Sequence, residues 1–381
     1  MKRLLAIADD LTGAAEIAGI GHRYALPTML ALNRPDSLCD GLTVIDSDTR
    51  SLNKAIAQAR IVQLIKGIDV SQFDLIYKKT DSVMRGQILI EVIAMMEQFG
   101  RPDALLVPQN PSRGRTIVDG EYRIDGVPLH QTSFADDPDH PATTSDAAAL
   151  LGKSERYPIS VFKSAANVDL RGLTLACAAS SHEVRYWADR ITPTVLPAGG
   201  ADFFIANLES NSLQPARPFL TEITAGHDLF ICGSASAYRD TLISTARNRG
   251  FALCTMPDDV FAGGDSTFWQ ATVRNTINGN RRTLVAIEQP PDRKPLTSSK
   301  LQKVLADLVA SVLDSVHIDH LFLEGGATAS AICRRMGWNQ LDVINELATG
   351  VVQMRAAHRS TPNIIIKPGS YPWPDWVLAA K

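Results

Sequence analysis

The sequence predicts an α/β fold of two domains, each with a mostly parallel sheet flanked by helices. Short apolar runs that end in turn residues alternate along the chain with segments whose apolar residues recur at helical spacing. This alternation is typical of strand–helix–strand units, which build parallel sheets with helices on both faces. The length of 381 residues exceeds what one hydrophobic core usually serves, so we expect two domains.

Composition and charge indicate a globular protein without a nucleic-acid or membrane partner. Charged residues make up 21% of the chain and hydrophobic residues 45%, and the formal charge is −3. This balance provides no general attraction to nucleic acid or to an anionic membrane, so an anionic ligand must be held by a local site. No apolar run reaches the roughly 18 residues of a membrane span, and the one at the N-terminus is too short for a signal peptide.

The cysteines are scattered and show neither a CxxC pair nor metal-ligand spacing. We interpret them as buried free thiols, which together with the missing signal peptide favours a cytoplasmic protein. They are Cys39, Cys177, Cys232, Cys254 and Cys333.

The first apolar run, residues 4–8, ends at Asp9 and Asp10. The run predicts a buried strand, and the Asp-Asp-Leu-Thr-Gly segment predicts a turn into a helix. Ligands in open α/β sheets bind at the carboxyl ends of the strands, so both carboxylates are candidate catalytic groups. A helix cap explains one of them, since Asp10 or Thr12 can supply it, but leaves the other unexplained. We therefore favour a functional pair over simple capping.

Charged residues also follow two later strands of the first domain. The strand at 42–46 leads to Arg50, and a helix is expected at 53–65. The strand at 73–77 leads to Lys78, Lys79, Asp81 and Arg85, followed by an amphipathic helix. Because loops at strand ends carry function more often than other surface segments, we favour a ligand site here over a solvated surface.

The rest of the first domain is predicted to contain a hairpin, a further helix and two arginines whose role stays open. Residues 121–126 predict the hairpin, and residues 197–202 predict the start of a helix that runs to residue 208. Arg113 and Arg115 suit a carboxylate or phosphate, and equally suit bracing of their own loop. Residues 211–225 have the composition of a linker, so we place the domains at 1–212 and 222–381.

The second domain offers small-residue turns at three strand ends. Strands at 229–232 and 320–324 are followed by Gly233-Ser234 and Gly325-Gly326, and Lys367-Pro368-Gly369 makes a third turn. Glycines at a helix N-terminus let backbone N–H groups meet an anion, although a Gly-Gly turn is also the tightest connection available. The repetition favours a nucleotide site.

Carboxylates with arginines in one domain and glycine turns in the other suit phosphoryl transfer to a hydroxy acid. Such transfer depends mainly on positioning and on neutralisation of charge by Mg²⁺ and cationic groups, with a carboxylate orienting the hydroxyl. The chain has no GxxxxGK[ST] motif, no protein-kinase motif set and no GxGxxG after its first strand. The last absence argues against a dinucleotide-dependent oxidoreductase.

At this point the motifs as a set resemble those of the four-carbon acid sugar kinases, over essentially the whole chain. The motifs are Ala8-Asp9-Asp10-Leu11-Thr12-Gly13-Ala14, Asp48-Thr49-Arg50, Lys78-Lys79-Thr80-Asp81-Ser82 with Arg85-Gly86, Gly114-Arg115-Thr116, Gly233-Ser234, Gly325-Gly326-Ala327-Thr328-Ala329 and Lys367-Pro368-Gly369.

The resemblance implies an N-terminal acid-sugar domain, a C-terminal nucleotide domain and an active site in the cleft between them. It implies that Asp9 and Asp10 are catalytic. The acid-sugar site would comprise Asp9, Asp10, Arg50, Lys79, Asp81 and Arg85, and the ATP site Gly233, Ser234, Ser236, Gly325, Gly326, Ala327, Thr328 and Gly369. No residue is assigned to a metal ion.

The chain departs from the family pattern at three places. Ala327 stands where relatives usually carry an acidic residue, Tyr371-Pro372 stands where they carry Phe-Gly, and Glu16 replaces the more usual Asp. The first two departures lie on the nucleotide side and leave open an altered ATP affinity or phosphate donor.

The sequence thus predicts an ATP- and Mg²⁺-dependent kinase that phosphorylates the terminal C4 hydroxyl of a four-carbon sugar acid such as D-threonate. The loop at 134–138 resembles the D-threonate branch of the family. A 3-oxo-tetronate or erythronate kinase is the alternative, and a non-catalytic sugar-acid-binding regulator is the alternative of another class. The expected partners are a small sugar acid and ATP or ADP, and the oligomeric state stays open, with a homodimer under consideration.

Overall fold

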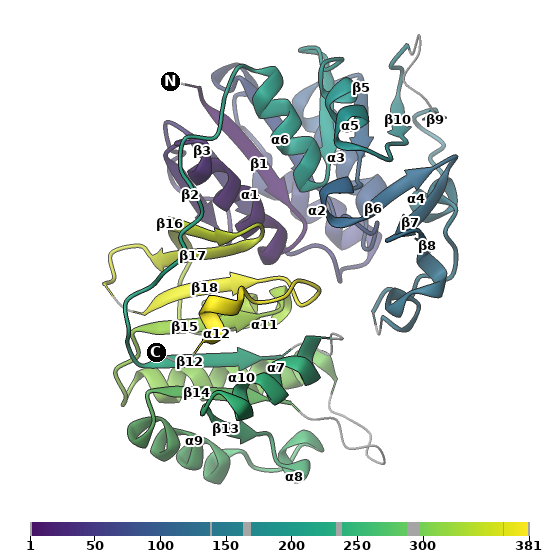
Figure 1. Cartoon of the computed structure of the whole chain (residues 1–381). Helices are drawn as coiled ribbons and strands as arrows, with labels where there is room; N and C mark the ends of the chain where they lie inside the picture. Colours follow the sequence, from purple (N-terminus) through teal and green to yellow (C-terminus); the bar gives the residue numbers. More distant parts are fainter. Residues whose placement is uncertain are drawn as a thin grey trace. The chain divides into compact units, whose positions relative to one another are not determined.

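The computed structural model describes residues 2–137, 139–162, 169–233, 238–287, 297–360 and 362–379. The chain divides into two compact units (Figure 1). The first unit comprises Met1–Thr28 and Asn33–Ala216, and the second comprises Met29–Leu32 and Arg217–Lys381. A short segment from the beginning of the chain therefore belongs to the second unit.

The first unit is built on a parallel sheet. Its strands are hydrogen-bonded in the order β3-β1-β4-β11-β5-β10-β9. Strands β1 and β3 are buried along their whole length, as expected for parallel strands covered on both faces. The strands are β1 (Leu4–Ala8), β3 (Leu42–Asp46), β4 (Leu75–Lys79), β5 (Asp103–Val107), β9 (Ile159–Phe162), β10 (Leu173–Ala176) and β11 (Val195–Gly199).

Helices cover both faces of this sheet. Leu5 and Ile7 of β1 belong to a core that also contains the apolar faces of α2 and α3. On the opposite face, Tyr77 of β4 lies against Phe203 and Phe204 of α6, with ring centroids 6.1 and 5.0 Å apart. Helices α1 and α5 pack beside α6. The helices are α1 (Leu11–Arg23), α2 (Lys54–Ile65), α3 (Ile88–Phe99), α4 (Ala147–Leu151), α5 (Ser181–Ala188) and α6 (Ala201–Ser210).

A small antiparallel sheet follows β5 and confirms the predicted hairpin. It consists of β6 (Arg115–Val118), β7 (Glu121–Ile124) and β8 (Val127–Pro128). Single turns of 3₁₀ helix lie around it and elsewhere in the unit: η1 (Val70–Gln72), η2 (Pro111–Arg113), η3 (Leu129–Gln131) and η4 (Ser133–Asp136).

Two predicted elements of the first unit were wrong in their bounds. The strand predicted at 73–77 continues through Lys78 and Lys79, because Lys78 forms an ion pair with Glu91 that allows its complete burial. Residues 195–199 form strand β11, which lies between β4 and β5 in the sheet, and α6 begins only after it. Pro197 and the Gly-Gly pair had suggested a helix start at this place.

The sheet of the second unit is parallel on one side and antiparallel on the other. Strands β13, β14, β12, β15 and β18 pair in parallel in this order, and β17, β16 and β2 continue the sheet with antiparallel pairings. The strands are β2 (Thr28–Ala31), β12 (Asp228–Cys232), β13 (Ala252–Thr255), β14 (Arg282–Ala286), β15 (His320–Glu324), β16 (Gln340–Ala348), β17 (Val351–Ala356) and β18 (Asn363–Lys367).

An aromatic cluster forms the core on one face of this sheet. Phe230 and Phe322 stack on neighbouring strands with ring centroids 4.0 Å apart, and Trp373 meets both rings edge-on. Apolar residues of α7 and α12 complete this core. Helices α9, α10 and α11 pack against one another in sequence. The helices are α7 (Tyr238–Asn248), α8 (Asp258–Phe261), α9 (Thr267–Gly279), α10 (Ser298–Leu313), α11 (Gly326–Arg335) and α12 (Asp375–Leu378).

These sheets confirm the predicted α/β class with mostly parallel strands flanked by helices. All five cysteines are free, and four of them are buried, as predicted, while Cys39 is partly exposed. Within the described ranges, no helix is long and apolar enough to cross a membrane.

Candidate active site

The predicted acid-site residues come together because three neighbouring strands end at the same edge of the first unit's sheet. Strands β3, β1 and β4 lie side by side in register, with Ala8 opposite both Asp46 and Lys79. The loops that leave these strands carry Asp9 and Asp10, Arg50, and Asp81 with Arg85. The carboxyl ends of parallel strands thus gather the charged residues into one cluster.

Asp10 is the N-cap of α1, and Asp9 has a different environment. The Asp10 carboxylate accepts the backbone N–H of Gly13 at 2.8 Å through Oδ1 and the hydroxyl of Thr12 at 2.6 Å through Oδ2. Asp9 is buried and makes no cap. Among the described residues its Oδ1 has no hydrogen-bond partner. Capping thus explains Asp10 and leaves Asp9 without that explanation.

Arg50 lies among three carboxylates. Its Nε donates to Asp9 Oδ2 and its Nη1 to Asp10 Oδ2, each at 2.7 Å, and its Nη2 lies 3.6 Å from Asp81 Oδ1. Gly86 helps to hold this position: its φ is +84°, and a Cβ there would lie 3.1 to 3.3 Å from atoms of Arg50. A side chain at Gly86 would therefore press against the arginine.

Arg85 binds Asp81 with two nitrogens. Its Nε and Nη2 donate to the two carboxylate oxygens at 2.9 and 3.0 Å, a bidentate geometry that arginine forms with planar carboxylates. The remaining terminal nitrogen, Nη1, donates to Asp137 Oδ2 at 2.8 Å. Both predicted arginines are thus engaged by carboxylates of the protein itself.

The arginines of the cluster lower the pKa values of Asp81 and Asp9. Burial raises the pKa of Asp81, but the neighbouring Arg85 and Arg50 guanidinium groups outweigh it and hold this pKa well below its usual 3.8. Burial also opposes the ionised form of Asp9, yet Arg50 and Lys78 leave the pKa of Asp9 lowered. Asp81 and Asp9 therefore stay ionised at neutral pH.

Lys79 lies beside the cluster without contacting its carboxylates. Its Nζ donates to the Thr80 carbonyl at 2.9 Å and lies 3.5 Å from Glu16 Oε2. The glutamate that departs from the family pattern therefore pairs with a lysine that the resemblance assigns to the acid site. The adjacent Lys78 lies 2.6 Å from Glu91 of α3, with both side chains buried, and the sequence analysis had missed this pair.

The sequence analysis noted the loop at 134–138 for its resemblance to the D-threonate branch, but it assigned no site role to Phe134, Asp137 or the nearby His140, which contact the two arginines. Asp137 pairs with Arg85, the ring of Phe134 lies 5.3 Å from the Arg85 guanidinium, and His140 Nε2 lies 3.0 Å from the Arg50 carbonyl. Arg115 lies over the same Phe134 ring and donates to Ser82. Arg115 thus braces its surroundings, which is one of the two roles that its sequence left open.

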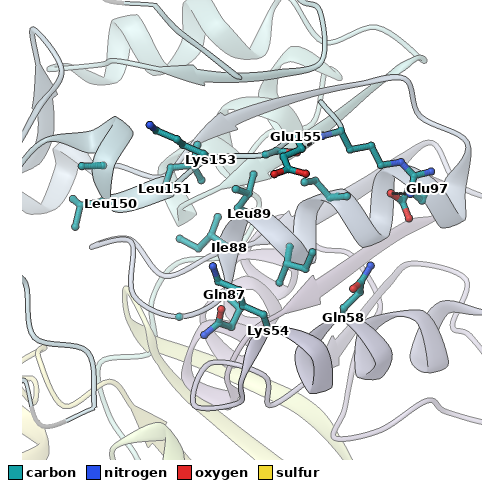
Figure 2. Close-up of a pocket in the computed structure, with 17 residues that line it drawn as sticks. Lys54, Gln58, Gln87, Ile88, Leu89, Glu97, Leu150, Leu151, Lys153 and Glu155 are labelled. Carbon is teal, nitrogen blue, oxygen red and sulfur yellow. Dashed lines mark hydrogen bonds and ion pairs between the residues drawn. The ribbon is translucent and has the colours of Figure 1, made fainter. Parts of the chain in front are cut away.

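A depression of about 540 Å³ lies next to this cluster, at the start of α3. Figure 2 shows Ile88 and Leu89 of α3 between Leu150 and Leu151 on one side and Gln87 and Lys54 on the other. Gly86, which packs against Arg50, also lines it. Among the described residues, its lining contains none of the charged side chains assigned to the acid site.

The small-residue turns of the second unit also lie side by side. Strands β12, β15 and β18 are parallel neighbours, with Glu324 opposite both Cys232 and Lys367 at their ends. Gly233, Gly325 and Gly369 follow these three strands. Ser234 and Ser236, which the resemblance assigns to the ATP site, lie outside the described residues.

The turn at Gly325 leads directly into α11. Gly325 is the N-cap with φ +96°, so Gly326, Ala327 and Thr328 form the first turn, whose N–H groups have no partner within the helix. Thr328 packs against Gly233, where an added Cβ would lie 2.1 Å from Thr328 Oγ1. Backbone N–H groups at such a turn suit a phosphate.

A buried ion pair fixes the ends of β15 and β18 beneath these turns. Lys367 Nζ lies 3.0 Å from Glu324 Oε2 and donates to the Tyr371 carbonyl at 2.6 Å. Trp373 Nε1 also donates to Glu324 Oε2, at 3.1 Å. Burial lowers the pKa of Lys367 in spite of the glutamate. Glu324 and Trp373 were not among the predicted residues.

Across the residues that the structure describes, no group of three or more His, Cys, Asp or Glu side chains is arranged to hold a metal ion. Magnesium in phosphoryl-transfer sites is usually held by one or two carboxylates together with the substrate's phosphates, and so needs no such group.

Comparison with known proteins gives a family for each half of the chain. A model described as "Sugar-binding N-terminal domain" matches residues 4–236, and one described as "Nucleotide-binding C-terminal domain" matches residues 260–371. The chain is 24% identical to a D-threonate kinase of Salmonella typhimurium, over 91% of this chain and 89% of the relative. It is 22% identical to a 3-oxo-tetronate kinase of Methylobacterium radiotolerans, over 97% and 96%.

A shorter match and two solved structures complete the comparison. A D-erythronate kinase of Heliobacterium modesticaldum is 30% identical over 42% of this chain and 38% of the relative. A crystal structure from Salmonella typhimurium LT2 has a TM-score of 0.75 at 16% identity, over 98% of this chain and 97% of the other. One from Haemophilus influenzae has a TM-score of 0.70 at 17% identity, over 98% of both chains. These structures share the fold.

Proposed function

Because this chain belongs to the four-carbon acid sugar kinase family and is a phosphotransferase, we propose that it phosphorylates the C4 hydroxyl of D-threonate, with ATP as donor. The main observation in support of an acceptor site is that Arg50 lies between Asp9 and Asp10 at the strand ends. 3-Oxo-tetronate and D-erythronate are the alternative acceptors, since kinases named for these acids are also similar to the chain.

In the proposed acceptor site, Arg85 and Arg50 bind the carboxylate of the acid. Guanidinium groups match planar carboxylates and stay charged at any relevant pH. The aspartates orient the hydroxyl at the other end of the acid. We assign this role to Asp9, because its Oδ1 is an acceptor without a partner, whereas both oxygens of Asp10 are already engaged.

In the proposed donor site, the turns at Gly233, Gly325 and Gly369 hold the nucleotide. The backbone N–H groups of the first turn of α11 face the phosphates, and Thr328 supplies a hydroxyl beside Gly233. Ala327 contributes only its backbone N–H, because its methyl group cannot bind a cation. Glu324 and Lys367 act beneath the turns as positioning residues.

The reaction forms a bond between the C4 oxygen and the γ-phosphorus and breaks the bond to the bridging oxygen, so that ADP leaves. The hydroxyl proton passes to a carboxylate, for which Asp9 is the candidate. Mg²⁺ carried by the nucleotide would neutralise charge on the phosphates. The cluster suits such a cation, because its carboxylates outnumber its guanidinium groups, and Asp9 and Asp10 would face it.

The experiment that tests this function measures ADP release from Mg-ATP by the purified protein. The panel contains D-threonate, D-erythronate, L-threonate, their oxo analogues and a blank without acid. We expect acid-dependent release with the highest kcat/KM for D-threonate, and an Asp9→Asn variant serves as the catalytic control. ADP release that no acid increases, from protein shown to be folded, would contradict the proposal.

A further inference from the structure

The Nη1 nitrogen of Arg85 is the terminal donor of this side chain that does not bind Asp81. Nε and Nη2 hold the two oxygens of Asp81 at 2.9 and 3.0 Å, and Nη1 is 2.8 Å from Asp137 Oδ2. Arg85 is one-quarter exposed, whereas Asp81 is almost completely buried. Asp137 therefore already occupies one N–H of Nη1, a position that a carboxylate approaching Arg85 from solvent would otherwise take.

A second carboxylate cannot join Asp137 at this nitrogen without repulsion between like charges. Two carboxylates that share one site disfavour their joint ionisation. The pKa of Asp137, which burial alone would raise, is lowered by hydrogen bonds from the backbone N–H of His140 and by Arg85. Asp137 is therefore ionised at neutral pH, and it competes with a ligand carboxylate for Nη1 of Arg85.

The Asp137 carboxylate is less tied to the backbone of the site than the carboxylates of Asp10 and Asp81 are. Asp10 caps α1, and Asp81 accepts the backbone N–H groups of Val83 and Arg85. The Asp137 side chain accepts the backbone N–H groups of Asp139 and His140 of its own loop. The η4 cap uses the backbone N–H of Asp137, which donates to the Phe134 carbonyl, so displacing the side chain alone leaves this cap in place.

The same loop is fastened to the site at two further points. The Phe134 ring lies 5.3 Å from the Arg85 guanidinium, and His140 Nε2 lies 3.0 Å from the Arg50 carbonyl. Contacts of this kind, partly exposed, contribute little each, so the loop is held by several weak attachments. Such an element can change position when a competing ligand arrives.

We infer that Asp137 occupies the substrate carboxylate's position on Arg85, and that the acid binds by displacing this side chain. The inference rests on the proposed function, because it takes the ligand to be a sugar acid. Asp137 is thus a specificity-determining residue. A ligand must supply a carboxylate to replace it, and a neutral four-carbon polyol cannot do so.

The experiment compares Asp137→Asn with the wild-type enzyme in the D-threonate kinase assay. The amide keeps the shape and the loop hydrogen bonds but removes the competing charge. We expect the KM for the acid to fall about three- to fivefold, the range of a partly exposed ion pair, with the KM for ATP unchanged. Asp137→Glu should return the KM toward the wild-type value, because it restores the charge.

Asp139→Asn is the matched control, since it removes an exposed carboxylate from the same loop, and its KM should equal that of the wild type. A KM for Asp137→Asn that is unchanged or raised overturns the inference, because Asp137 would then only position Arg85. That result is distinct from failure of the proposed function, in which the wild-type enzyme phosphorylates no acid and the inference falls with it.

Discussion

Arg85 holds both oxygens of Asp81 with Nε and Nη2 and keeps Nη1 for a second carboxylate. In the proposed acceptor site, this division lets one side chain both stabilise the fold and bind the acid. We expect Arg85→Ala to raise the KM for the acid roughly tenfold to hundredfold, the value of a charge-assisted hydrogen bond, with the KM for ATP intact. Arg171→Ala is the control, since Arg171 is exposed and pairs with exposed Asp169. An unchanged KM would remove Arg85 from the acid site.

The depressed pKa of Asp81 predicts how stability depends on pH. Its pKa is lower in the folded protein than the usual 3.8, so the ionised form stabilises the fold above about pH 4 and this contribution is lost as the pH falls further. Thermal melts of the wild type and Asp81→Asn should differ at pH 7 and converge toward pH 2. If the difference in melting temperature between the two proteins is the same at every pH in that range, ionised Asp81 does not contribute a pH-dependent part of the stability. Exposed Asp169→Asn should leave the wild-type curve unchanged.

Replacing Asp9 and Asp10 one at a time with asparagine should distinguish a catalytic role from a capping role. Asp10 caps α1, so Asp10→Asn should change stability by less than about 1 kcal/mol, because asparagine caps nearly as well, whereas Asp10→Ala should lose about 1 kcal/mol. Asp9→Asn should reduce kcat with a smaller effect on the KM for the acid. Melting curves and steady-state kinetics measure the two effects. If Asp10→Asn loses more kcat than Asp9→Asn does, Asp10 rather than Asp9 has the catalytic role.

The buried pair Lys78–Glu91 predicts a large loss of stability when one partner is neutralised. Glu91→Gln leaves an uncompensated ammonium in the core and should cost about 3 kcal/mol in urea unfolding of the first unit. Lys78→Met combined with Glu91→Leu should recover most of this loss, because no charge stays buried. On the same helix, Glu97→Gln breaks a partly exposed pair with Arg156 and should cost under about 1 kcal/mol. If the loss of stability in the double variant equals the sum of the losses in the two single variants, Lys78 and Glu91 do not interact as a pair.

Gly233 has no room for a side chain, and this predicts an effect on the nucleotide site. A Cβ would lie 2.1 Å from Thr328 Oγ1, so Gly233→Ala should displace the first turn of α11 and raise the KM for ATP more than that for the acid. Gly279→Ala is the control, because nothing lies within 4 Å of its added Cβ. Adding Thr328→Ala to Gly233→Ala should recover part of the stability but not the ATP affinity. An equal rise in both KM values would indicate general damage.

Sequence patterns located the ends of β1, β12 and β15, but not the side-chain contacts that charged residues make within each unit. The run before Asp9 and the glycines at Gly233 and Gly325 are local signals, since a strand followed by a turn is visible within about ten residues. Asp137 gave no such signal, because its partner Arg85 lies 52 residues away and the loop has no periodic pattern. Lys78 with Glu91 escaped for a similar reason: lysine in a strand suggests its exposed end until the partner is known.

Strand β11 shows a different limit. Its Pro197 lacks a backbone N–H and pairs in register with Leu105 in the middle of a parallel sheet, where proline is rare. The following Gly199 and Gly200 also resemble a turn, and a Cβ at Gly199 would meet the Val107 carbonyl oxygen at 2.0 Å. The local preferences of proline and glycine thus favoured a turn at this place. The residues form a strand instead, and the close approach of the Val107 backbone leaves room only for glycine at position 199.

Strand β2 has a consequence for biosynthesis. Met29 pairs with Asp342 of β16, so a segment made among the first residues completes a sheet whose other strands are made last. On the ribosome, the pairing of this segment with β16 has to wait until nearly the whole chain has emerged. A fragment that starts at Arg217 would lack this strand and expose the edge of β16 to pairing between molecules. The C-terminal unit is therefore a poor choice for separate expression unless residues 29–32 are supplied with it.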